Sequence, residues 1–157
     1  RCLKTFGWRK IGAWQVSVET TSILASDVLV LGQIFQKLGD FVNAIKYLNE
    51  QIELFRSADE WLYLPTGLNS RARFHIANND FDAALADLTE SLDISQRTGA
   101  RYGEWEALID LAQLHAARNK LKLGAEILIK AKNLPEMDQY KFRDNEISQL
   151  EKALALH

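Results

Sequence analysis

The feature that most constrains the fold of this chain is a pattern of apolar and small residues that recurs every 40 positions. A fixed period of this size is typical of repeat proteins, in which one unit cannot bury its apolar face alone and neighbouring units stack into a continuous core. A chain of 157 residues has room for three to four such units. The matching positions are Val28, Leu68 and Leu108; Gly32, Ala72 and Ala112; Ala44, Ala84 and Gly124; and Leu48, Leu88 and Leu128.

Each period contains two stretches with the spacing of an amphipathic helix. Val28, Leu31 and Phe35, for example, share one helical face. Runs of alternating β-branched residues are missing, so the sequence favours an all-α chain built from antiparallel helix pairs. We expect one repeat domain over residues 20–157, in which a last helix covers the open end of the stack. The expected repeats span about 22–57, 64–98 and 102–134, and the capping helix spans about 138–156.

Turn-forming residues separate the expected helices. Residues 39–40, 78–80 and 119–120 are the predicted turns within the three pairs. Pro65 suits the first turn of a helix, where a missing N–H costs nothing. Gly99 is expected to end a helix in the left-handed conformation.

Residues 1–19 leave two alternatives open. Their apolar residues fit the second helix of a preceding repeat, whereas Gly7 and Gly12 weaken a helix and favour an irregular apolar arm. Since the chain starts at Arg1 rather than methionine, we expect that something precedes it in the gene or was removed.

The small residues of the period have a steric explanation. Where two helices cross closely, one side must be small, and we expect Gly32, Ala72 and Ala112 on first helices to meet Ala44, Ala84 and Gly124 on second helices. Larger residues should then fill the space beside each crossing. They are Phe41, Phe81 and Leu121.

This small–large pattern inside a two-helix unit resembles the tetratricopeptide repeat, in a variant with longer helices. The resemblance implies a right-handed superhelix that binds protein or peptide in a groove lined by the first helix of each pair. The second unit departs from the family pattern at Arg71 and Asn79, and the third at Asn119, Leu121 and Gly124. The matching residues in the first unit are Leu31-Gly32, Phe35, Gly39, Phe41, Ala44 and Leu48.

A narrower resemblance concerns short motifs along the chain. They are similar to the C-terminal repeats of bacterial signalling proteins that carry an upstream NTPase of the NACHT or a related signal-transduction class, or a caspase-like protease. This resemblance implies a sensor arm that restrains or releases the upstream domain. The motifs are Leu64-Pro65-Thr66-Gly67-Leu68, Arg71-Ala72-Arg73, Ala86-Asp87-Leu88, and Tyr140-Lys141-Phe142-Arg143-Asp144 with Glu146.

The sequence provides little support for catalysis or for a cofactor. It has no phosphate-binding loop, no dinucleotide-binding glycine motif, and no His-Glu-x-x-His or Cys-x-x-Cys. His75 and His115 hold equivalent positions in two repeats, where we expect buried or half-buried histidines rather than metal ligands. Cys2 lacks an activating neighbour. We therefore predict no enzyme activity, no cofactor and no metal.

Charge and hydropathy argue against two classes of partner, nucleic acids and membranes. With a net charge of −2 and scattered basic residues, direct nucleic-acid binding is not expected. The most apolar run, residues 23–38, contains Asp27 and Lys37 and is too short to span a membrane. No signal peptide is visible, and the single cysteine is natural in a reducing compartment, so we expect a cytoplasmic protein that binds protein or peptide.

The repeat register also predicts groove residues. Arg73 is the strong cation among them and could hold an acidic group of a partner. Arg71 faces the packing side, where an ion pair with Glu104 or Glu106 is expected. The positions that form a carboxylate clamp in some family members are only partly matched in this chain. The predicted groove residues are Gln33, Lys37, Asn69, Arg73, Ile76, Ile109, Gln113 and Ala116.

Aromatic residues form a further group at the edges of the inter-repeat loops. They could either anchor a partner or pack the loop corners. These residues are Trp61, Tyr63, Tyr102 and Trp105.

Together these features predict a non-catalytic binding scaffold, as the sensor or interaction arm of a larger bacterial signalling protein. The sequence leaves two alternatives open: a free-standing adaptor, and the regulatory repeat domain of a transcription activator.

Overall fold

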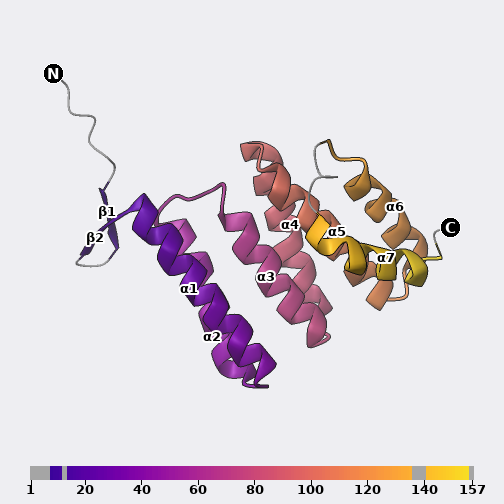
Figure 1. Ribbon diagram of the computed structural model, residues 1–157, viewed down its shortest axis with the longest axis horizontal. Helices are drawn as coiled ribbons and strands as arrows, with labels where there is room; N and C mark the ends of the chain where they lie inside the picture. Colours follow the sequence, from indigo (N-terminus) through magenta and orange to yellow (C-terminus); the bar gives the residue numbers. More distant parts are fainter. Residues whose placement is uncertain (1–7, 12–13, 136–140, 156–157) are drawn as a thin grey trace.

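The structure, a computed structural model of the chain, describes residues 8–11, 14–135 and 141–155. Helices dominate it and follow one another as antiparallel pairs, which lie side by side along the long axis of the molecule (Figure 1). The all-α repeat array expected from the period is confirmed. The three pairs are α1 (Val18–Lys37) with α2 (Phe41–Ser57), α3 (Leu64–Ala77) with α4 (Phe81–Thr98), and α5 (Arg101–Ala117) with α6 (Leu121–Lys132).

The C-terminal end is covered by a shorter element than expected. A 3₁₀ turn, η2 (Lys141–Arg143), leads into α7 (Asp144–Ala153), and Asp144 and Glu146 in its first turn suit a helix N-terminus. Leu150 and Leu154 are buried in the same apolar cluster as residues of α5 and α6. Residues 138–140 and 156 of the expected helix, including Tyr140, lie outside the described residues.

The N-terminal segment differs from both alternatives. Strands β1 (Trp8–Ile11) and β2 (Trp14–Ser17) form an antiparallel hairpin in which Trp8 pairs with Ser17 and Ile11 with Trp14. The expectation of a helix or an irregular arm is therefore wrong for these residues, whose aromatic and β-branched content suits strands. Helix α1 follows directly from Val18. Residues 1–7 and 12–13 lie outside the described residues.

The turns explain two departures from the family pattern. Gly39 and Gly99 adopt φ values of 77° and 72°, as a left-handed helix end requires. Asn79 and Asn119 take the same role at φ 60° and 57°. Asparagine is the residue that replaces glycine most readily in this conformation, so the turn geometry is kept in all three pairs.

The small residues meet at the helix crossings as predicted. Gly32 faces α2 so closely that a Cβ atom there would lie 3.3 Å from Leu48 Cγ. At Gly124 the corresponding atom would lie 3.0 Å from the carbonyl oxygen of Ala112. Among the larger neighbours, however, Phe41 and Leu121 remain exposed because each is the first residue of its helix, beside the turn.

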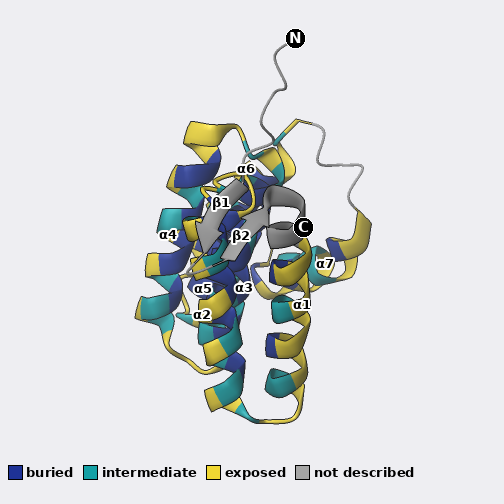
Figure 2. Cartoon of the chain, turned by 90° about the vertical axis from the view of Figure 1, so that its left-hand side faces the viewer, coloured by how far each residue is buried: buried dark blue, intermediate teal, exposed yellow. Residues whose placement is uncertain are grey.

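Burial is uneven along the stack. Helix α5 lies between neighbours on several sides, and most of its residues are buried. Helix α1 at the other end is largely exposed, as Figure 2 shows by its yellow stretches. The stack therefore has a covered C-terminal end and a bare first helix.

Candidate protein-binding face

The predicted groove residues lie along one side of α1, α3 and α5, which we call the first-helix face. The structure divides these residues by exposure. Gln33 and Lys37 on α1 are exposed, and Ile76, Gln113 and Ala116 on α3 and α5 are half-buried. These residues offer a mixed polar surface with amide groups, one cation and short apolar patches.

Two predicted groove residues are not on this surface. Asn69 and Ile109 are completely buried, so their assignment to the groove is wrong. The Asn69 side-chain amide donates a hydrogen bond of 3.2 Å to the carbonyl oxygen of Gly103, and Ile109 belongs to the apolar cluster between α5 and α6. Their positions point into helix contacts because α3 packs directly against α5.

The close approach of these helices depends on Gly103. A Cβ atom at this position would lie 2.7 Å from Pro65 Cβ and 2.7 Å from Ser95 Oγ. Real Cβ contacts are not that short, so a glycine is required where α5 begins. The sequence pattern did not single out this glycine.

Arg73 is half-buried, and its guanidinium already pairs with groups of its own chain. Its Nη1 lies 3.0 Å from Asp110 Oδ2 and 3.2 Å from Glu106 Oε1, and its Nη2 donates a hydrogen bond to Ser70 Oγ. The prediction that Arg73 binds an acidic group of a partner is corrected accordingly, since two carboxylates from α5 already neutralise it.

A second arginine reaches the same carboxylate from the C-terminal segment. Arg143 Nη2 lies 2.6 Å from Asp110 Oδ1 and also 2.6 Å from Glu146 Oε1. Both Arg143 and Asp110 are buried. This network of Arg73, Glu106, Asp110, Arg143 and Glu146 connects α3, α5, η2 and α7, and we call it the arginine–carboxylate network.

Within the network, the opposite charges counteract the effect of burial on the pKa of each charged group. Burial alone would lower the pKa of Arg143, but its hydrogen bonds to Glu146 and Asp110 outweigh this effect and raise it. Burial would raise the pKa of Glu146, yet the hydrogen bonds and charge of Arg143 hold it below its usual value. For Asp110, burial raises the pKa while the two arginines oppose the shift. The network therefore fastens the end of the chain onto α5.

Arg71 has the structural role expected of it, but with other partners. Its guanidinium lies 2.6 Å and 2.8 Å from the two oxygens of Asp87, and it donates a third hydrogen bond of 2.7 Å to Asn49. The predicted partners Glu104 and Glu106 are wrong. Because Asn49 belongs to α2 and Asp87 to α4, Arg71 joins neighbouring pairs.

Residues 29–57 match the family model of the tetratricopeptide repeat. The matched segment contains the C-terminal part of α1 and all of α2, with the Gly32 crossing inside it. Tetratricopeptide repeats generally mediate contacts between proteins and are typically not catalytic. No curated protein matches the chain.

The histidines of the second and third helix pairs fit the packing role. His75 lies 3.5 Å from an oxygen of Asp80, and His115 is buried with its Nδ1 lacking a hydrogen-bond partner among the residues that the structure describes. Burial, together with the charges of Lys120 and Arg118, lowers the pKa of His115. Within the described part of the chain, no group of three or more His, Cys, Asp or Glu residues could hold a metal ion.

The aromatic residues at the loop edges separate into two kinds. Trp105 is buried, and its ring lies 5.9 Å from the ring of Phe142. Trp61 and Tyr63 are half exposed beside the start of α3. Trp105 therefore packs the corner that receives the C-terminal segment, whereas Trp61 and Tyr63 stay accessible.

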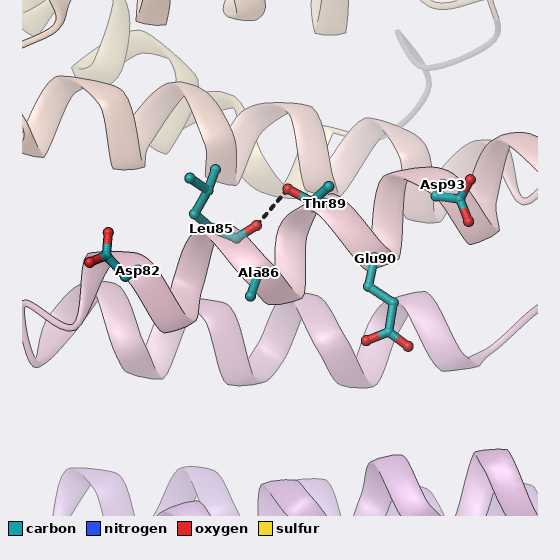
Figure 3. A pocket seen from close by; sticks show the side chains of 6 residues that line it. All are labelled: Asp82, Leu85, Ala86, Thr89, Glu90 and Asp93. Carbon is teal, nitrogen blue, oxygen red and sulfur yellow. Dashed lines mark hydrogen bonds between the residues drawn. The ribbon is translucent and has the colours of Figure 1, made fainter.

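A surface depression of about 580 Å³ lies on α4, and Figure 3 shows the side chains that line it. Its three carboxylates each face an arginine: Asp82 faces Arg118, Glu90 faces Arg56, and Asp93 faces Arg97. These contacts explain the acidic residues as exposed ion pairs, which contribute little energy.

Every helix in the described part of the chain is too short or too polar to cross a membrane.

Proposed function

We propose that this chain is a scaffold that binds protein or peptide through the first-helix face. The observation that carries the proposal is the stack of helix pairs, the first of which matches the tetratricopeptide repeat. Stacked helix pairs present an extended surface to which consecutive repeats contribute equivalent side chains. The proposal assigns no catalytic step, cofactor or nucleic-acid contact to the chain.

The accessible part of this face runs from α1 to the C-terminal end of α5. Gln33 and Lys37 are exposed there, and Gln113 and Ala116 are accessible in part. The arginine–carboxylate network closes the neighbouring part of the face, around Asp110. A bound segment is therefore expected to contact the amide side chains, with the network holding the surface rigid beneath it.

The proposal is tested by a pair of matched double variants. The tagged chain is used to capture proteins from its source cells, in parallel with Gln33→Arg/Gln113→Arg and with Gln96→Arg/Gln149→Arg. Both variants make the same chemical change, but Gln96 and Gln149 lie on α4 and α7. We expect the first variant to lose the captured proteins and the second to retain them. Equal capture by the two variants would rule out the first-helix face.

We further propose that the chain is the sensor or interaction arm of a larger bacterial signalling protein in the cytoplasm. Support comes from the short motifs shared with such proteins, which include Arg71-Ala72-Arg73 and Ala86-Asp87-Leu88. In the structure these motifs supply the Arg71–Asp87 ion pair between α3 and α4, and Arg71 also donates a hydrogen bond to Asn49 of the preceding pair.

The native size of the gene product tests this second part. An antibody raised against this domain should detect a band several times larger than 17.9 kDa in the source cells. A band near 17.9 kDa would contradict the sensor arm and leave a free-standing adaptor.

A further inference from the structure

Helix α1 exposes an unusually apolar face at the bare end of the stack. Residues on the side of α1 that faces away from α2 are open to solvent, and Val30 is 52% exposed. Figure 2 views this end and shows the exposed positions along α1 in yellow. Contiguous apolar surface of this kind usually marks an interaction site. The face, which we call the α1 outer face, consists of Ile23, Leu24, Val30, Leu31, Ile34 and Leu38.

The repeat register shows what this face does elsewhere in the chain. The residues equivalent to Ile34 are Phe74 on α3 and Leu114 on α5, and both are buried. Phe74 packs against Ala44 and Leu48 of the preceding second helix, and Leu114 lies in the cluster that contains residues of α4. The same helical face is therefore the stacking surface in the second and third pairs and is uncovered in the first.

One position indicates what kind of partner covers it. The stacking faces of α3 and α5 carry Gly67 and Ala107 at their centre, where the preceding helix approaches closely. The equivalent residue on α1 is Asp27, which is exposed. A carboxylate in the middle of an apolar contact needs a counter-charge, because an unpaired buried charge is costly. The stacking helix α2 supplies none opposite Gly67, where it presents Ile52, Gln51 and Phe55.

The chain itself carries the matching charge. Asp27 and Lys37 are the charged residues of the 23–38 segment, they lie ten positions apart, and neither makes an ion pair with another described residue. Two α1 helices packed antiparallel about a twofold axis near position 32 bring Asp27 of each copy next to Lys37 of the other. The same arrangement places Val30 of each copy opposite Ile34 of the other, so that the exposed apolar residues of the two copies pack together. A parallel arrangement would place like charges together.

We propose that the α1 outer face is a self-association surface, through which two copies of this chain form an antiparallel dimer with two Asp27–Lys37 pairs. Isologous twofold contacts of this type use one surface patch twice and close after two subunits. Gln33 of the first-helix face lies on another side of α1, whereas Lys37 contributes to both surfaces.

The first test measures the mass of the full chain by sedimentation equilibrium. We expect a concentration-dependent mass approaching twice 17.9 kDa. Val30→Glu should give the monomer, whereas Ile129→Glu, at a position on α6 that is 47% exposed, should leave the dimer intact. A wild-type chain that stays monomeric at all concentrations, or equal effects of the two substitutions, would overturn the proposal.

Charge exchange tests the orientation and controls for misfolding. Asp27→Lys and Lys37→Asp should each weaken the dimer about tenfold, because each single change creates two like-charge pairs. The double variant Asp27→Lys/Lys37→Asp should dimerise like the wild type. An equimolar mixture of the two single variants should also recover the dimer as a mixed species. If the double variant remains as weak as the single variants, the antiparallel pairing is wrong.

Discussion

Asp110 is a carboxylate within the apolar run Leu108-Ile109-Asp110-Leu111, and it is completely buried. Arginines from two directions, Arg73 and Arg143, reach its oxygens and oppose the rise in its pKa that burial causes. A buried carboxylate survives in proteins only with such partners. A lone acidic residue in an apolar helix therefore predicts an internal ion pair, but the sequence alone does not show which arginine is its partner.

Gly103→Ala tests the tightest residue contact. The added methyl would overlap the Pro65 ring and Ser95, so we expect a loss of about 1–3 kcal/mol in the free energy of unfolding, measured by urea denaturation. Gly67→Ala is the matched control, since its new atom would come no closer than 3.2 Å to a neighbour, Ile52 Cγ1, while gaining helix propensity. Equal stability of the two variants would show that α3 and α5 can separate without cost.

His115 should make the stability depend on pH. Its pKa in the folded chain lies below the value of 6.5 in the unfolded chain, so unfolding takes up a proton once the pH falls below about 6.5. Stability is therefore full above this pH and decreases as the pH falls towards the folded pKa. His115→Phe, which copies Phe35 of the first pair, should show a smaller fall in Tm between about pH 7.5 and about pH 5.5. An equal fall in Tm in the variant and in the wild type would show that other titratable groups cause the pH dependence.

At the scale of elements, α7 is held in two ways. Leu150 and Leu154 supply apolar contact with the last helix pair, and Arg143 supplies the buried ion pair with Asp110. Among the described residues, the expected capping helix was too long because residues 141–143 form the 3₁₀ turn η2 and α7 ends at Ala153, boundaries that helical spacing alone does not give. The sequence also missed the Arg143 contact, because the two residues are 33 positions apart and share no local pattern.

Arg143→Met should release α7. Removing Arg143 leaves the buried carboxylate of Asp110 with Arg73 as its remaining cation. We therefore expect the free energy of unfolding to fall by about 3 kcal/mol, the low end of the range for breaking a buried ion pair. Hydrogen exchange should become faster at the amides of residues 144–153. Arg97→Met is the control, because its ion pair with Asp93 is exposed and should contribute at most about 1 kcal/mol. Slow exchange in α7 of the Arg143 variant would contradict this role of the network.

At the scale of the whole molecule, the 40-residue period predicted the helix pairs and the small residues at their crossings. The groove was harder to predict, because the register gives the side of a helix but not how deeply a neighbour covers it. Asn69 and Ile109 are buried because neighbouring helices cover them, whereas Gln33 is exposed. The register alone does not distinguish these two cases. The hairpin before α1 was missed because the apolar residues of this segment also fit the second helix of a preceding repeat, and that register does not distinguish a helix from two short strands.

The most direct measurement of the proposed binding face is site-specific photo-crosslinking in the source cells. A photoreactive residue is placed at Gln33 or Gln113 on the first-helix face, and at Glu53 or Glu126 on the second helices of their pairs. We expect crosslinked protein adducts from the first two positions and few from the others. Adducts confined to Glu53 and Glu126, or none from Gln33 and Gln113, would contradict binding through the first-helix face.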